Sequence, residues 1–240
     1  MAELEKHYMV WLSTPHQAML EIAREMGFAH VVLDIEHGLF DLEAMDRIIA
    51  LGKALGMKMH AKVLGPETIP IQQALDMGCD SVIIPHIGDV DHAREVTLAA
   101  KYPPLGKRSF SGTRPARYNV VKPDYYEREN AATRCYPMIE SAAALKDVEA
   151  ILALPAVDGV FVGPSDLSLD SGRGAYRNTE ADKADLRRIA DAAKAAGKPW
   201  IMPAWTKAER HHAAELGASF MVVADEYGSL ITGLAEAIKE

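Results

Sequence analysis

The densest group of polar side chains in the sequence is Asp34-Ile35-Glu36-His37-Gly38, which directly follows an apolar run. Histidine is the usual general base near neutral pH, and a neighbouring carboxylate can fix its tautomer and orientation. In an extended segment, Asp34 and Glu36 share one face while His37 is offset into the following loop. The motif is short, so a loop histidine beside a capping aspartate is an alternative interpretation.

Two further acidic residues, Glu140 and Asp166, each stand close behind an apolar run. Acidic side chains are costly to bury unless they are paired or bind a cation. Two carboxylates, completed by water and substrate oxygens, are typical ligands of Mg²⁺ or Mn²⁺. A salt bridge, or a helix cap at Asp166, would explain the same residues. Cys79 and Cys135 lack the spacing of a zinc site and are expected to be buried thiols.

Basic residues offer a second kind of chemistry. Lys62 falls inside an apolar, strand-like run, where it either binds an anion, forms a Schiff base or packs its aliphatic stem. Arg108, Arg114 and Arg117 lie in the long segment 102–118. Arginine suits two-point binding of carboxylate or phosphate, although a solvated basic loop or a subunit contact is equally compatible with the pattern. His86 is left open between a site contact and a packed ring.

These candidates must be positioned by regular elements, and the apolar runs define them. The runs contain little polar alternation, which is typical of parallel strands covered on both faces. Helical patterns with capping residues lie between them, including a capping box predicted at Thr14–Gln17 and another at Thr206–Glu209. The strands are predicted at 8–12, 30–34, 58–63, 81–85, 134–139, 159–163, 199–203 and 219–223.

Eight alternating strands and helices predict a (β/α)8 TIM barrel, an α/β fold, formed by a single domain over residues 1–240. The length is close to the ~250 residues typical of that fold. A doubly wound open sheet is the alternative, but no G-x-G-x-x-G motif follows the first strand. Active sites of such barrels lie at the carboxyl ends of the strands. Glu140 and Asp166 would close adjacent strands about 4.8 Å apart, and segment 102–118 is expected over the same mouth.

Composition excludes several functional classes. The chain has 26 Lys and Arg against 34 Asp and Glu, a formal net charge of −8. Neutralising phosphates needs surplus basic residues, so no nucleic-acid partner is expected. No apolar run approaches the roughly 18 residues of a membrane helix. The charged start of the chain lacks a signal-peptide core, so we expect a cytoplasmic protein.

Five segments of the sequence, in order and over nearly the whole chain, resemble the HpcH/HpaI aldolase family: VVLDIEHG, ALDMGCDSVIIP, KYPPLGKRSF, MIES and VDGVFVGPSDLS. The resemblance implies a metal-dependent class II aldolase that reversibly cleaves a hydroxy-2-oxo acid into pyruvate, or a related 2-oxo acid, and an aldehyde. It also implies a divalent cation (Mg²⁺, Mn²⁺ or Co²⁺). The family is typically hexameric, a trimer of dimers with helices exchanged between neighbours.

The resemblance also implies individual roles. Glu140 and Asp166 fall on metal-binding carboxylates, His37 on the base histidine and Asp34 on the acidic residue beside it. Asp76 falls on an aspartate thought to reach the active-site histidine of a neighbouring subunit. Substrate contacts are expected from the backbone around three consecutive residues and from two basic side chains: Gly163, Pro164 and Ser165, with Lys62 and Arg108.

Two positions depart from the family's pattern. Lys62 stands where the family usually has arginine, and Met138 where it usually has glutamine. Lysine does not reproduce a two-point arginine contact, and methionine donates no hydrogen bond. The departures leave open a changed 2-oxo acid or a Claisen-type lyase or synthase acting on a carboxylate or acyl-thioester. A non-catalytic barrel that binds a small acid is a further alternative.

Overall fold

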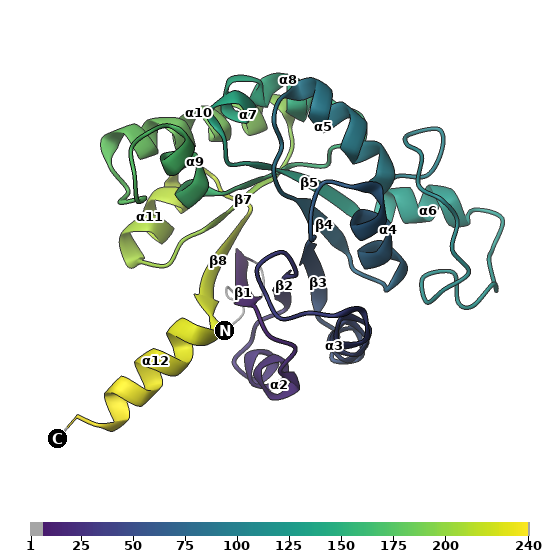
Figure 1. Cartoon of the computed structure of the whole chain (residues 1–240), viewed down its shortest axis with the longest axis horizontal. Helices are drawn as coiled ribbons and strands as arrows, with labels where there is room; N and C mark the ends of the chain where they lie inside the picture. The colour runs from purple at the N-terminus through teal and green to yellow at the C-terminus, as the bar shows by residue number, and fades with distance from the viewer. Residues whose placement is uncertain (1–6, 240) are drawn as a thin grey trace.

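The computed structural model describes residues 7–239, and within them eight parallel strands form a closed barrel (Figure 1). Each strand pairs with the next along the chain, and β8 closes on β1. The predicted (β/α)8 barrel is confirmed, with strand ends shifted by two residues at most. The strands are β1 Tyr8–Leu12, β2 His30–Asp34, β3 Lys58–Lys62, β4 Ser81–Ile84, β5 Arg134–Ile139, β6 Val160–Val162, β7 Trp200–Pro203 and β8 Phe220–Asp225.

Helices surround the barrel, and several begin where capping residues predict. Thr206 and Glu209 form the predicted capping box, and Asp41 and Asp89 accept hydrogen bonds from the first turns of their helices. The helices are α2 Gln17–Glu25, α3 Leu42–Ala54, α4 Thr68–Asp76, α5 Val90–Thr97, the 3₁₀ turn η1 Leu98–Ala100, α6 Tyr125–Ala132, α7 Ala142–Lys146, α8 Val148–Leu152, α9 Pro164–Asp170, α10 Glu180–Ala196, α11 Lys207–Glu215 and α12 Glu226–Ala237.

The capping box predicted at Thr14–Gln17 is wrong. Helix α2 begins only at Gln17, after an extended His16 whose side chain makes no capping bond. The hydroxyl of Thr14 instead donates to Glu226 Oε2 at 3.0 Å, at the start of α12. The physical reason is a tertiary partner: the buried carboxylate of Glu226 accepts the N–H of Ser13 and the hydroxyl of Thr14, which positions this segment against α12.

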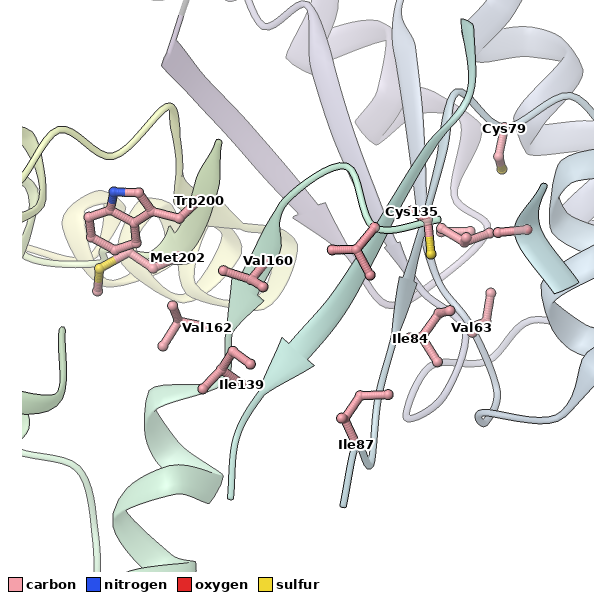
Figure 2. Close-up of a cluster of buried hydrophobic side chains, with 14 of the residues drawn as sticks. Val63, Cys79, Ile84, Ile87, Cys135, Ile139, Val160, Val162, Trp200 and Met202 are labelled. Atoms are coloured by element: carbon pink, nitrogen blue, oxygen red, sulfur yellow. The ribbon is translucent and has the colours of Figure 1, made fainter. Parts of the chain in front are cut away.

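Most strand positions are apolar on both faces of the sheet, and both faces are covered. Side chains that point into the barrel, such as Met9, Val32, Ile83 and Phe161, form one buried cluster. A larger cluster fills the layer between the strands and the helices, as Figure 2 shows for side chains of β4 to β7. Packing on both sides fixes the strand ends and therefore the side chains that follow them.

Helix α12 is placed differently from the other helices, since it projects away from the barrel (Figure 1). Its side chains Leu230, Ile231 and Leu234 are exposed. A helix with a partnerless apolar face is unusual in an isolated domain. Every helix within residues 7–239 is too short or too polar to span a lipid bilayer.

The amino-terminal end of the barrel interior contains a chain of polar side chains. His30 Nδ1 lies 3.0 Å from His60 Nε2, and His60 Nδ1 lies 2.7 Å from Ser81 Oγ. Burial, reinforced by the neighbouring His30, lowers the pKa of His60 to about 3. The folded protein therefore keeps this imidazole neutral at pH values where an exposed histidine is protonated.

This difference predicts acid sensitivity. Between pH 6.5 and about 3 the unfolded chain binds a proton at His60 that the folded chain does not, so stability falls as the pH falls. We expect His60 alone to remove about 2 kcal/mol of unfolding free energy between pH 7.5 and pH 5.0. Urea unfolding at both pH values measures the difference. His60→Gln should reduce it by a similar amount and His211→Gln, at an exposed histidine, should not; equal pH dependence in all three proteins would contradict the prediction.

Candidate functional site

A pocket of about 410 Å³ opens at the carboxyl ends of the strands. This is the end of the barrel where the sequence predicts the site. The lining residues come from β1, β2, β3, β5, β6 and β7 and from the segments that follow them. They include Trp11, Asp34, His37, Lys62, Met138, Phe161, Gly163, Pro164, Ser165, Asp166, Tyr176, Trp205 and Glu209.

A buried ion-pair network around Lys62 forms the floor of this region. The register of β2 and β3 pairs Asp34 with Lys62, and the ammonium lies 3.5 Å from Asp34 Oδ1 and forms a closer ion pair with Glu36. Trp11 donates its indole N–H to Asp34 Oδ2 at 3.2 Å. Burial is the largest single influence on Glu36 and disfavours its ionised form, but the bond and charge of Lys62, with the charges of His37 and His86, together lower the pKa of this carboxyl. Lys62 is therefore held in place by two carboxylates.

Glu36, for which the motif alone gives no clear role, is the carboxylate that contacts the ring of His37. Its Oε1 lies 3.5 Å from His37 Nε2, whereas Asp34 accepts only the backbone N–H of His37, at 3.3 Å. The chain turns sharply after β2, and a Cβ at Gly38 would lie 2.1 Å from the carbonyl oxygen of Asp34. The turn thus directs the exposed imidazole toward the pocket while both carboxylates stay beneath it.

His86, which the sequence leaves open, lies at the mouth and not in the core. Its backbone adopts φ 58°, a conformation that favours glycine. Two bonds hold it there: the N–H of His86 donates to Glu140 Oε1 at 2.5 Å, and its Nε2 lies 2.5 Å from Glu36 Oε1. His86 therefore connects the Lys62 network with Glu140, a long-range contact that no spacing in the sequence indicates.

Glu140 and Asp166 come together from neighbouring β5 and β6, and both line a shallow hollow beside the pocket. A Cβ at Gly163 would lie 2.7 Å from Glu140 Cβ and 2.9 Å from its Oε2, so only glycine allows this approach. Burial raises the pKa of Glu140, and the charge of Asp166 acts in the same direction while the N–H of His86 opposes it. Asp166 is exposed, and within residues 7–239 its carboxylate forms no salt bridge.

The residues present fit a hard divalent cation, although they do not form a complete protein cage. Among the described residues, no group of three or more His, Cys, Asp or Glu side chains is placed to hold a metal ion. Mg²⁺ commonly binds through one or two carboxylates and keeps several waters. A buried carboxylate with a raised pKa beside an unpaired one is a donor set that a cation would stabilise.

The expectation that segment 102–118 covers the mouth is wrong. The segment follows η1 and not a strand, so helix α5 has already returned the chain toward the other end of the barrel. Arg108 is buried there, with its Nη2 2.8 Å from Oδ1 of Asp76, the last residue of α4. Within this chain, neither Arg108 nor Asp76 lines the pocket that Lys62 and His37 line.

Comparison with known proteins agrees with this architecture. The model of the HpcH/HpaI aldolase/citrate lyase family matches residues 7–230. A hydroxypyruvate/pyruvate aldolase of Deinococcus radiodurans is 34% identical over 89% of this chain and 78% of its own. A 5-keto-4-deoxy-D-glucarate aldolase of Klebsiella pneumoniae is 31% identical over 96% of this chain and 91% of its own.

A solved structure of an HpcH/HpaI aldolase/citrate lyase family protein from Burkholderia cenocepacia superimposes with a TM-score of 0.89. It is 25% identical and covers 98% of this chain and 93% of its own. The match therefore includes the barrel and the segments that carry the candidate site. The chain belongs to the HpcH/HpaI aldolase/citrate lyase family.

Proposed function

We propose that this protein is a metal-dependent class II aldolase that reversibly cleaves a hydroxy-2-oxo acid into pyruvate, or a related small 2-oxo acid, and an aldehyde. The observation that carries the proposal is that Glu140 and Asp166 line one hollow and that Asp166 also lines the adjoining pocket of Lys62 and His37. Relatives of similar length named as aldolases support the same reaction class. We infer that the protein acts in the cytoplasm.

Glu140 and Asp166 would hold the cation, which we propose to be Mg²⁺, Mn²⁺ or Co²⁺. When bound, such an ion polarises the keto group of the substrate and stabilises negative charge on its oxygen. Gly163 permits the close approach of Glu140, as described above. The proposed ligands are oxygen atoms only. Such ligands suit these ions, whereas a dedicated zinc site usually includes Cys or His.

The residues of the chain would divide the remaining tasks. Backbone groups around Gly163, Pro164 and Ser165, which line the pocket at the start of α9, would bind the substrate carboxylate. In the cleavage direction, His37 would take the proton of the C4 hydroxyl, directly or through water, as the C3–C4 bond breaks and the aldehyde forms. The electron pair of that bond becomes the enolate of the 2-oxo acid, which takes up a proton at C3. Glu36 would hold the imidazole for this transfer.

Lys62 would supply a cationic contact to the substrate from the barrel interior. Its ammonium is shared with Asp34 and Glu36, so it offers a point contact and not the planar pair of donors that arginine presents. Met138 lines the same wall and offers no hydrogen-bond donor. Because of these two residues, hydroxypyruvate and acyl-thioesters should be tested as donor substrates together with pyruvate.

We also propose that the active protein is a homo-oligomer, as a hexamer built from dimers. The exposed apolar face of α12, which projects from the barrel in Figure 1, would pack on a second copy. Asp76 does not line the pocket of its own chain and is held by buried Arg108. In line with the family resemblance, we propose that it acts on His37 of a neighbouring copy. Arg108 would then support the site indirectly through Asp76.

Removal of the cation tests the central proposal. Dialysis against EDTA should reduce pyruvate release from a 4-hydroxy-2-oxo acid by about 100-fold or more, because the stabilisation of the enolate oxygen is lost. Addition of Mg²⁺, Mn²⁺ or Co²⁺ should restore the rate. Glu140→Gln and Asp166→Asn should resemble the dialysed enzyme, while Glu149→Gln, at an exposed carboxylate on α8, should not.

Two outcomes would contradict this mechanism. One is a rate that survives complete chelation. The other is covalent trapping of the substrate on Lys62 by borohydride, because trapping would demonstrate a Schiff base in place of metal chemistry.

Subunit complementation tests the role of Asp76. His37→Ala and Asp76→Asn should each lose most activity in separate preparations. After mixing, unfolding and refolding at equal amounts, about a quarter of the sites would combine intact His37 with intact Asp76 from a neighbour. The measurement is the aldol rate of the mixture against each parent. A mixture as inactive as its parents would show that the two residues do not meet across an interface.

A further inference from the structure

The pocket has a second wall, opposite His37 and Lys62, that the proposed chemistry does not use. It is formed by Trp205, Thr206 and Glu209 at the start of α11 and by Tyr176 from the segment after α9. The inference below rests on the proposed aldolase function, and it concerns the part of the substrate that leaves as the aldehyde.

Glu209 is held rigidly in this wall. It is buried, with 8% of its surface exposed, and its Oε2 accepts hydrogen bonds from the N–H of Thr206 at 2.7 Å and from its hydroxyl at 2.8 Å. Within residues 7–239 all hydrogen bonds of this carboxylate end on Oε2, so Oε1 is left without a protein partner. Oε1 is not among the buried unpartnered atoms of the described residues, so it is open to the pocket, where a ligand that donates a hydrogen bond can reach it.

The second capping box of the chain provides an internal comparison. Asp182 in α10 also accepts bonds from its capping threonine, Thr179, through one oxygen. Its other oxygen is occupied, because Arg173 Nε lies 3.1 Å from Oδ1. The open oxygen of Glu209 is therefore not a general property of a capping box; it occurs where the box lines the pocket.

The chemistry of the wall defines what it can bind. An ionised carboxylate accepts hydrogen bonds but donates none, so it binds hydroxyl groups and repels carboxylates. Burial and the charge of Glu209 raise the pKa of Tyr176, which keeps that phenol protonated. Trp205 adds an aromatic face. We propose that Glu209 is a specificity-determining residue that selects uncharged aldehydes carrying a hydroxyl group and disfavours aldehydes carrying a carboxylate.

The other charged side chains of the pocket also disfavour an aldehyde that carries a carboxylate. Asp34 and Asp166 line it as well, and the ammonium of Lys62 is already bound by two carboxylates. A 2-oxo acid brings one carboxylate, for which Lys62 and the start of α9 are available. A second carboxylate on the aldehyde would lie beside Glu209, and among the described residues that line the pocket no further Lys or Arg is there to balance it.

Three small aldehydes test the inference with pyruvate as donor: glycolaldehyde, which is hydroxylated and uncharged; propanal, which lacks the hydroxyl; and glyoxylate, which carries a carboxylate. We expect the wild-type enzyme to have its highest kcat/KM with glycolaldehyde. In Glu209→Gln the amide oxygen can still accept from Thr206, so the helix cap is retained while the charge is lost. The ratio of kcat/KM for glycolaldehyde over glyoxylate should then fall by about tenfold.

Asp182→Asn is the matched control, because it changes the acid of the other capping box and should keep the wild-type ratio. Comparison of ratios between variants cancels the different intrinsic reactivities of the aldehydes. A wild-type preference for glyoxylate over glycolaldehyde, or an unchanged ratio in Glu209→Gln, would overturn the inference.

Exchange of the C3 hydrogens of pyruvate in D₂O separates this inference from the proposed function. Exchange measures enolate formation without any aldehyde. If exchange proceeds while the ratio is unchanged in Glu209→Gln, only the role of Glu209 is refuted. If the metal-loaded protein catalyses neither exchange nor aldol addition, the proposed function fails and the inference fails with it.

Discussion

The site depends on the ion-pair network in which Lys62 is held between Asp34 and Glu36 at the carboxyl end of β2 and β3. A lone ammonium inside a barrel would be too costly to keep charged, and a lone pair of carboxylates would be equally unfavourable. Because each charge compensates the others, the chain can keep a cationic side chain in an apolar barrel. Glu36 then extends the network to His37 and His86, so one carboxylate organises both imidazoles at the mouth.

His86 links the ion-pair network of Lys62 to Glu140 at the end of β5. Its left-handed backbone is held by bonds to Glu36 and Glu140, and Glu140 in turn can approach β6 only because residue 163 is glycine. A change at one of these positions would therefore disturb others that lie far away in the sequence. Such shared dependence explains why a site of this kind is built on strands, whose positions are fixed by packing on both faces.

Helix residues at both ends of the barrel take part in the proposed site. The amino-terminal ends, at the mouth, supply the wall with Glu209 and the start of α9. The carboxyl-terminal end of α4, on the other side, presents Asp76 with its partner Arg108. A barrel that uses both ends is suited to an assembly in which the outer surface of one copy completes the mouth of the next, as we propose.

The sequence by itself determined the barrel, because continuous apolar runs separated by capped amphipathic segments permit few other arrangements. It also predicted the end of the barrel at which Asp34, His37, Lys62, Glu140 and Asp166 lie. The carboxyl ends of all eight parallel strands meet at that end, so a residue at such a strand end must lie there.

Only the tertiary structure decided which side chains bind each other. The contacts of Glu36, His86 and the open oxygen of Glu209 join segments far apart in the chain, so no local spacing encodes them. The misplaced segment 102–118 has the same origin: its composition suggested a site loop, but its position after η1 puts it at the opposite end. Local patterns report the type of element, whereas contacts between distant segments depend on how the closed sheet brings them together.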